Sequence, residues 1–201
     1  MTSHDRRYNT LDAAQAYDLR VKSKRRLSGW LEASMVRRAI KHIDGGKLLD
    51  CPCGTGRIDA LLRERSQDVF GVDNAEPMLQ VYLEGDSRRA GQVADVFDLP
   101  FEDGSFSWVV SHRLFHHFHE SERRTDMLTS LARVAREGVV FYAWLNTPVV
   151  RRDQASRKGR RSISMTDLHA IVANSPLQVE RVHWAAWPFS PKAMVVCSKS
   201  G

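Results

Sequence analysis

The chain has 201 residues, a length that fits one domain around a single hydrophobic core, and its formal net charge is +6. No apolar run approaches the roughly 20 residues that span a bilayer, and the first residues lack the apolar stretch of a signal peptide, so we expect a cytoplasmic protein. Three cysteines, Cys51, Cys53 and Cys197, are too few for a disulfide framework, and we expect them to be reduced thiols.

Positive charge is concentrated at the two ends of the sequence. Residues 1–50 hold 11 basic residues against 6 acidic ones, residues 51–150 hold 10 against 15, and residues 151–201 hold 9 against 3. An acidic centre with basic ends favours a negatively charged partner that meets those ends. Solubility alone is the alternative explanation.

Two helical segments are expected near the N-terminus, over 11–21 and 28–43, with a basic run at 22–26 between them. The second segment has an apolar stripe that should pack on a sheet, formed by Trp30, Leu31, Met35, Val36, Ala39 and Ile40. Gly45 and Gly46 then end the helix, because glycine tolerates the left-handed conformation of a C-terminal cap.

The stretch 47–65 predicts a strand, a tight turn and a helix. Residues 48–49 are typical of a buried parallel strand, Gly54 and Gly56 form the turn, and 58–65 has helical periodicity. A glycine without a side chain lets a ligand lie against backbone amides at a helix N-terminus. We therefore interpret the turn as a binding site for a nucleoside cofactor.

The spacing of the glycines helps to select that cofactor. A dinucleotide site needs a third glycine three positions after the second, where this chain has Asp59. Asp50, at the end of the strand, would repel a pyrophosphate but would suit the cationic methionine portion of S-adenosylmethionine. The turn therefore favours S-adenosylmethionine.

Strands and helices continue to alternate after this unit. Further strands are expected over 69–73, 91–96, 106–111 and 138–145, with helices beginning near Pro77 and over 120–136. The run 151–161 has six cations and one carboxylate and is interpreted as a loop. A helix capped by Ser164 and an antiparallel hairpin of strands 177–184 and 192–198 then complete the chain.

Three motifs occur in order: Leu49-Asp50-Cys51-Pro52-Cys53-Gly54-Thr55-Gly56-Arg57, then Gly71 to Leu79, then Asp95 to Val110. They resemble the motifs of class I S-adenosylmethionine-dependent methyltransferases, of the small methyltransferase-11 or -25 type. The resemblance implies an α/β fold, a three-layer α/β/α sandwich with a Rossmann-like, seven-stranded, mostly parallel sheet and an antiparallel C-terminal hairpin strand. It also implies one domain over 1–201, with a helical lid (1–45), a cofactor core (46–145) and a C-terminal part (146–201).

Asp73 ends the second strand, where a carboxylate can accept both hydroxyls of a ribose, and helix capping is its alternative role. The resemblance implies that Met78 presses on the adenine, unless it is a core methionine, and that Asp95 accepts a hydrogen bond from the exocyclic amine of the adenine, with the Val96 backbone amide beside it. The full set assigned to cofactor binding is Asp50, Gly54, Gly56, Asp73, Asn74, Met78, Asp95, Val96 and Ser111.

Histidines cluster after the strand 106–111, where a methyl acceptor would lie. His116 and His117 are candidate bases, and the alternative is that the histidines only line a loop. His112 and His116 lack a third ligand, so we expect no metal site. The candidate residues for substrate binding or a lid are Tyr8, Tyr17, His112, Arg113, Arg157 and Arg160. The two tyrosines are alternatively buried anchors of the N-terminal helices.

These features predict an S-adenosylmethionine-dependent methyltransferase acting on oxygen or nitrogen of a small-molecule or lipid-like, anionic acceptor. The basic loop would then hold a phosphate or carboxylate, or dock on an anionic membrane surface. Two alternatives stay open: an RNA methyltransferase, and a non-catalytic S-adenosylmethionine-binding protein that acts through its basic ends. The acceptor, the methylated atom, the need for a base and the oligomeric state are also left open.

Overall fold

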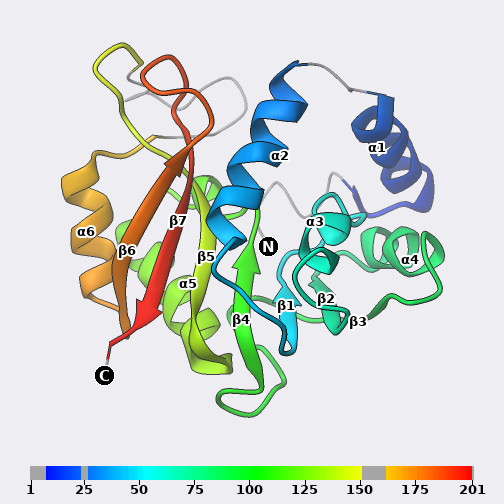
Figure 1. Cartoon of the computed structure of the whole chain (residues 1–201). Helices are drawn as coiled ribbons and strands as arrows, with labels where there is room; N and C mark the ends of the chain where they lie inside the picture. Colours follow the sequence, from blue (N-terminus) through cyan, green and yellow to red (C-terminus); the bar gives the residue numbers. More distant parts are fainter. Residues whose placement is uncertain (1–7, 24–26, 151–161, 201) are drawn as a thin grey trace.

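A seven-stranded sheet forms the centre of the protein (Figure 1). The computed structural model describes residues 8–23, 27–150 and 162–200. The strands are β1 Leu48–Asp50, β2 Val69–Asp73, β3 Ala90–Val93, β4 Phe106–Ser111, β5 Ala135–Trp144, β6 Leu177–Trp184 and β7 Lys192–Lys199. Their order is β3-β2-β1-β4-β5-β7-β6, and β7 is antiparallel to both of its neighbours while the other pairs are parallel.

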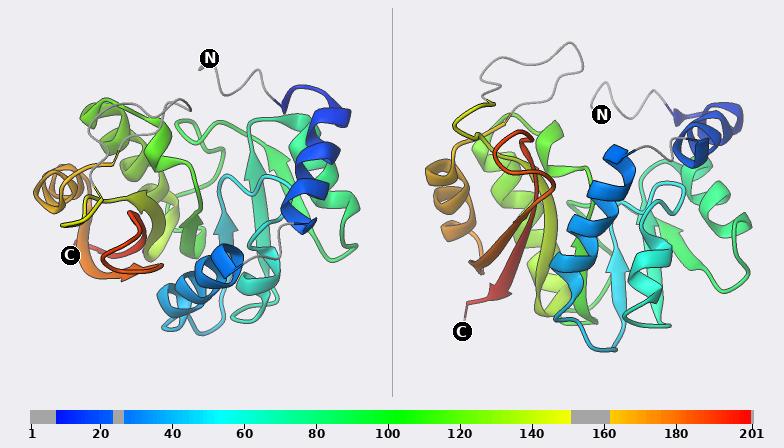
Figure 2. Two further views of the ribbon diagram at one scale, coloured as in Figure 1. Left: turned by 90° about the horizontal axis from the view of Figure 1, so that it is seen from above. Right: turned by 45° about the horizontal axis from the view of Figure 1, so that its top comes forward.

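Helices cover both faces of this sheet (Figures 1 and 2). They are α1 Leu11–Ser23, α2 Leu27–Ile40, α3 Asp59–Arg63, α4 Glu76–Glu84, α5 Ser121–Val134 and α6 Met165–Ala173, with a short 3-10 helix, η2, at Phe115–His117. Helices α2 and α3 lie on one face, α5 and α6 lie on the other, and α1 packs on α4 near β3 (Figure 2). The fold class expected from the sequence is confirmed.

Alternate residues of the central strands fill two apolar clusters, one on each face. Val109 of β4 packs with Leu128 of α5, and Val110 packs in the cluster that contains Met35 of α2. Every residue of β4 is buried, as expected for a parallel strand that is covered on both faces. Burial of each large apolar side chain contributes about 1.5–3 kcal/mol.

Some element boundaries differ from those expected. Helix α2 ends at Ile40 instead of residue 43, and β3 ends at Val93, so that Asp95 and Val96 lie in the turn after the strand. Four residues of the expected stripe on α2 are buried, Leu31 is half-buried, and Trp30 is 66% exposed. Trp30 is exposed because the N-terminal end of α2 extends past the ends of the strands (Figure 1).

The C-terminal part follows the sequence closely where it is described. The Ser164 hydroxyl accepts a hydrogen bond from the Asp167 amide at 3.0 Å, which confirms the expected cap of α6. Arg157, Arg160 and the rest of the run 151–161 lie outside the described residues. Within 8–23, 27–150 and 162–200, no helix is both long enough and apolar enough to cross a membrane.

A buried carboxylate, Asp59, joins the glycine turn to α4. Arg63 Nε and Arg89 Nε lie 3.2 and 3.1 Å from its Oδ2, and the Tyr82 hydroxyl donates to its Oδ1 at 3.0 Å. A Cβ placed on Gly56 would lie 2.8 Å from Arg89 Nη2 and 3.0 Å from the Tyr82 ring. A side chain at Gly56 would therefore have to displace Arg89 or the Tyr82 ring, a packing constraint that adds to the room for a ligand expected from the sequence.

Gly56→Ala should destabilise the protein more than Gly45→Ala, a matched control. Both glycines have a positive φ, 87° and 74°, which costs an alanine about 1–2 kcal/mol. A Cβ on Gly45 would meet no atom within 4 Å, so only Gly56→Ala adds a packing cost, about 1–3 kcal/mol further. Urea denaturation of the two variants measures this difference. Equal unfolding free energies would contradict the packing role of Gly56.

Candidate functional site

The carboxyl ends of β1, β2 and β4 meet at one edge of the sheet. Asp50 of β1 pairs in register with Gly71 of β2 and Val110 of β4. Asp50, Asp73 and Ser111 therefore end three neighbouring strands. In open α/β sheets, ligands bind beyond this edge. The structure thus brings together the first, second and fourth strand ends, as the motifs indicated.

Asp73 ties the glycine turn to the end of β2. Its Oδ2 accepts a hydrogen bond from the Gly54 amide at 2.8 Å, and its Oδ1 accepts one from the Ala75 amide at 2.9 Å. A carboxylate oxygen can accept more than one hydrogen bond, so a hydroxyl group of a ligand could also donate to either oxygen. Gly54 has a φ of 55°, a conformation that glycine adopts without strain.

Asp50 is buried beside this turn without a partner. Its exposed fraction is 0%, and neither carboxylate oxygen has a hydrogen-bond partner among the described residues. Burial raises the pKa of Asp50 well above its ordinary value, and the charges of Asp59 and Asp73 raise it further. Such a group favours a cation, because a nearby positive charge would stabilise the ionised carboxylate.

The residues assigned to adenine lie around the ends of β2 and β3. Met78 is buried, and its Cε would lie 3.6 Å from a Cβ placed on Gly54, so it borders the glycine turn. Asp95 is exposed, and its Oδ1 accepts a hydrogen bond from the Phe97 amide at 3.0 Å. Val96 is buried next to it. Asn74 is exposed after β2.

A buried carboxylate on α2, Glu32, lies at the end of β4 and was missed by the motif analysis. Its Oε1 lies 3.3 Å from His112 Nε2, 3.1 Å from Arg113 Nε and 3.2 Å from Arg57 Nη1, and its Oε2 lies 3.4 Å from Lys192 Nζ. Burial would raise its pKa, but the pairing with His112 and the two arginine charges lower the pKa below the ordinary range. The signal in the sequence is a carboxylate inside the apolar stripe of α2.

The two candidate bases differ in their surroundings. His116 is 3% exposed, and its ring stacks on Trp144 at a centroid distance of 5.3 Å and an interplanar angle of 5°. The ring of His117 lies 4.3 Å from that of His116 and is half-buried. Across the described ranges, no three His, Cys, Asp or Glu side chains are grouped to hold a metal ion.

The N-terminal tyrosines reach the same edge. The rings of Tyr8 and Tyr17 pack edge to face at a centroid distance of 5.1 Å, and Tyr17 interacts with Arg113. Arg113 is the one residue other than glycine with a positive φ, 69°, in the described part of the chain. Tyr17 therefore reaches the end of β4, as a lid residue would, while both rings are only partly exposed, as anchors would be.

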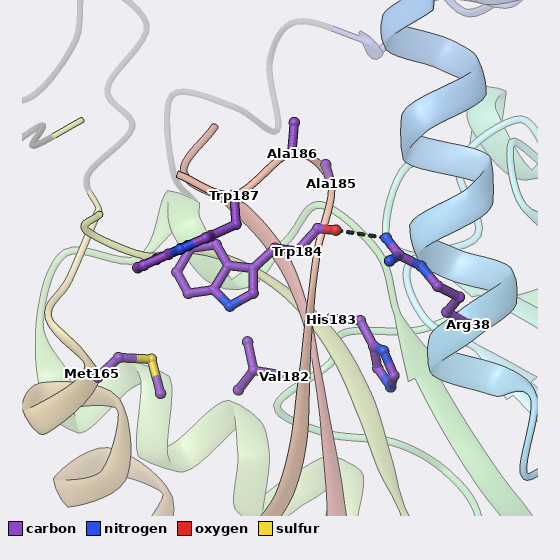
Figure 3. Close-up of a pocket in the computed structure, with 8 residues that line it drawn as sticks. All are labelled: Arg38, Met165, Val182, His183, Trp184, Ala185, Ala186 and Trp187. Carbon is purple, nitrogen blue, oxygen red and sulfur yellow. Dashed lines mark hydrogen bonds between the residues drawn. The ribbon is translucent and has the colours of Figure 1, made fainter. Parts of the chain in front are cut away.

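An open pocket lies beside β6 (Figure 3). It measures about 710 Å³ and is lined by Arg38, Met165, Val182, His183, Trp184, Ala185, Ala186 and Trp187. Arg38 Nη2 donates a hydrogen bond to the Trp184 carbonyl at 2.6 Å across it. None of the residues assigned from the sequence lines this pocket, so it is separate from the edge where they gather.

Comparison with known proteins identifies the central part of the chain. Residues 49–143 match the family model described as "Methyltransferase domain". A Mus musculus protein named "Probable tRNA methyltransferase 9B" is 32% identical over 116 residues, which cover 54% of this chain and 24% of that protein. "Demethylmenaquinone methyltransferase" of Clavibacter sepedonicus is 33% identical over 119 residues, 57% of this chain and 49% of that protein. The chain thus spans a quarter to a half of the length of these relatives.

A solved structure supports the same fold. Magnesium protoporphyrin IX methyltransferase from Synechocystis PCC 6803, with bound SAH, superposes with a TM-score of 0.68 at 16% identity, over 86% of this chain and 84% of that one. At this identity the likeness establishes the fold. Together with the family match, it confirms the resemblance to class I methyltransferases that the motifs indicated.

Asp50→Asn should stabilise the ligand-free protein at neutral pH. Because burial raises the folded-state pKa of Asp50, its contribution to stability is full below about 3.8, the ordinary value, and is lost as the pH rises through the folded-state pKa. Asparagine does not ionise, so we expect a Tm higher by about 2–4 °C at pH 7, the shift that about 1 kcal/mol produces.

Thermal melts at pH 4 and pH 7 test this, with the exposed Asp68→Asn as the control. The gain should shrink at pH 4 and be absent in the control. An Asp50→Asn variant that melts below the wild type at pH 7 would contradict the assigned environment.

Proposed function

We propose that this protein, whose residues 49–143 belong to the methyltransferase domain family, is a class I S-adenosylmethionine-dependent methyltransferase acting on oxygen or nitrogen of a small, anionic acceptor. S-adenosylmethionine supplies a methyl group on a sulfonium, which is already a good leaving group. The chain therefore contributes mainly by binding and orienting the two reactants.

The observation that carries the proposal is the buried carboxylate of Asp50. An unpaired buried carboxylate is costly, and a positively charged ligand removes that cost. The ammonium and sulfonium groups of S-adenosylmethionine provide the charge, and Asp73 keeps lone pairs for ribose hydroxyls. The residues present therefore fit this cofactor. Its adenine would contact the exposed Asp95 and the buried Met78.

The acceptor would approach between α1 and the end of β4. In this proposal residues 1–45 act as a lid on a single domain, with Tyr17 and Arg113 facing the acceptor. His117 removes the proton from the attacking oxygen or nitrogen, because its ring is less buried than that of His116. His116, stacked on Trp144, holds the segment in place.

Transfer to RNA is the second candidate. It is supported by the similarity of the chain to the mouse protein named as a probable tRNA methyltransferase, and by the basic ends of the sequence. The small acceptor is supported by the similarity to the Clavibacter protein named demethylmenaquinone methyltransferase. The matched segment covers 49% of that protein, against 24% of the mouse protein.

Asp73→Asn should weaken the binding of S-adenosylmethionine by about 10–100-fold. The variant loses the charge of the acceptor for the ribose hydroxyls, and hydrogen bonds to charged groups contribute about 1.5–3 kcal/mol. Calorimetry with S-adenosylmethionine measures the affinity, Asp68→Asn serves as the control, and circular dichroism verifies folding. Undiminished affinity in a folded variant would refute the ribose assignment, and binding of NAD instead would refute the function.

His117→Ala should lower kcat by about 10²-fold or more while keeping cofactor affinity, because a general base contributes about 10²–10⁴-fold. The assay uses methyl-tritiated S-adenosylmethionine with a cell extract that is then separated into lipid, RNA and small-molecule fractions. We expect label in the lipid or small-molecule fraction. Label confined to RNA would favour the second candidate, and full activity of His117→Ala would exclude this residue as the base.

A further inference from the structure

The ion pairs around Glu32 do not balance in charge. Arg57, Arg113 and Lys192 carry permanent positive charges at neutral pH and surround one carboxylate. Burial lowers the pKa of His112 despite its pairing with Glu32, so His112 adds little positive charge there. Three cations on one anion leave an excess of two positive charges.

These cations remain accessible although Glu32 is not. The side chain of Glu32 is 8% exposed, whereas those of Arg57, Arg113 and Lys192 are 27%, 28% and 27% exposed. The Nε of Arg57 is buried and has no hydrogen-bond acceptor among the described residues. Glu32 therefore works as a buried anchor that holds three cationic groups together, with donor capacity left over.

The elements that supply the cations place them beside the cofactor motifs. Arg57 follows Gly56 directly, and Arg113 follows the end of β4 by two residues. Lys192 is the first residue of β7, and Glu32 lies on α2, which packs on one face of the sheet. A small cavity of about 80 Å³ between α2 and α3 is bordered by Glu32, Arg57 and His112.

An ordinary structural ion pair looks different in the same protein. On the next turns of α2, Arg37 pairs with Glu64 alone, through three hydrogen bonds of 2.8–3.1 Å, and the charges of this exposed pair cancel. Like charges held together around Glu32 repel one another, and a bound anion would relieve that repulsion.

We propose that Arg57, Arg113 and Lys192, gathered on Glu32, form a binding site for a carboxylate or phosphate group. The anion belongs either to the acceptor or to the amino-acid end of the cofactor, and in both cases the site fixes the direction from which the reactants meet. This inference rests on the proposed function for the identity of the ligand, but its charge geometry stands independently of it.

The first test uses inorganic phosphate as the probe on the full chain. Phosphate at ten times its Kd should raise the Tm by about 3–5 °C over sodium chloride of equal ionic strength, from the linkage between binding and stability. Lys192→Gln and Arg113→Gln should lose this increment, and the matched control Arg37→Gln should keep it. The proposal is overturned if phosphate gives no increment, or if all three variants behave alike.

The second test distinguishes the two sources of the anion. S-adenosylhomocysteine carries the amino-acid carboxylate of the cofactor, and 5′-methylthioadenosine lacks it. If the anion is that carboxylate, Lys192→Gln weakens S-adenosylhomocysteine about 10-fold or more and leaves 5′-methylthioadenosine unchanged. If neither affinity changes while the phosphate increment is lost, the anion belongs to the acceptor. Failure of the wild type to bind S-adenosylhomocysteine would refute the proposed function, and the phosphate result would still decide the anion site.

Discussion

The hydrogen bond from the Gly54 amide to Asp73 is the contact on which the site depends. It connects the turn after β1 to the end of β2, and the second Asp73 oxygen holds the Ala75 amide at the start of α4. Asp50 ends β1, directly before the first of these turns, and is fully buried. In the proposed function, the same contact positions Asp73 for the ribose, and beside it the carboxyl group of Asp50 is buried without a hydrogen-bond partner among the described residues.

Charge is segregated along this edge of the sheet. Buried carboxylates, Asp50 and Asp73, lie at the ends of β1 and β2, and the cations gathered on Glu32 lie toward the end of β4. A zwitterionic ligand, or a cationic cofactor next to an anionic acceptor, matches this separation because each charge meets its opposite. The sequence showed an acidic centre and basic ends. In the structure, Arg57 and Arg113 of that centre join Lys192 of the basic C-terminal part around Glu32.

Much of the fold could be predicted, because periodicity and turn residues are local signals. The strand ends at Asp50 and Asp73 and the cap at Ser164 follow from such signals. Glu32 stands out locally as a carboxylate in an apolar stripe, but its pairing with Lys192 could not be found this way, since the two residues are 160 positions apart and meet only after β7 inserts beside β5. The different surroundings of His116 and His117 could not be predicted either, because the stacking of His116 on Trp144 depends on tertiary packing.

We propose Asp50 as the counterion of a cationic cofactor, and proton release on binding tests this role most directly. The raised pKa of Asp50 favours its protonated form in the ligand-free protein, and a bound cation lowers that pKa. Calorimetric titration with S-adenosylmethionine is carried out in two buffers of different ionisation enthalpy and repeated between about pH 5 and 8. The difference between the buffers gives the number of protons released on binding. We predict net proton release in the wild type that is absent in Asp50→Asn. Binding without proton exchange, or equal release by both proteins, would contradict it.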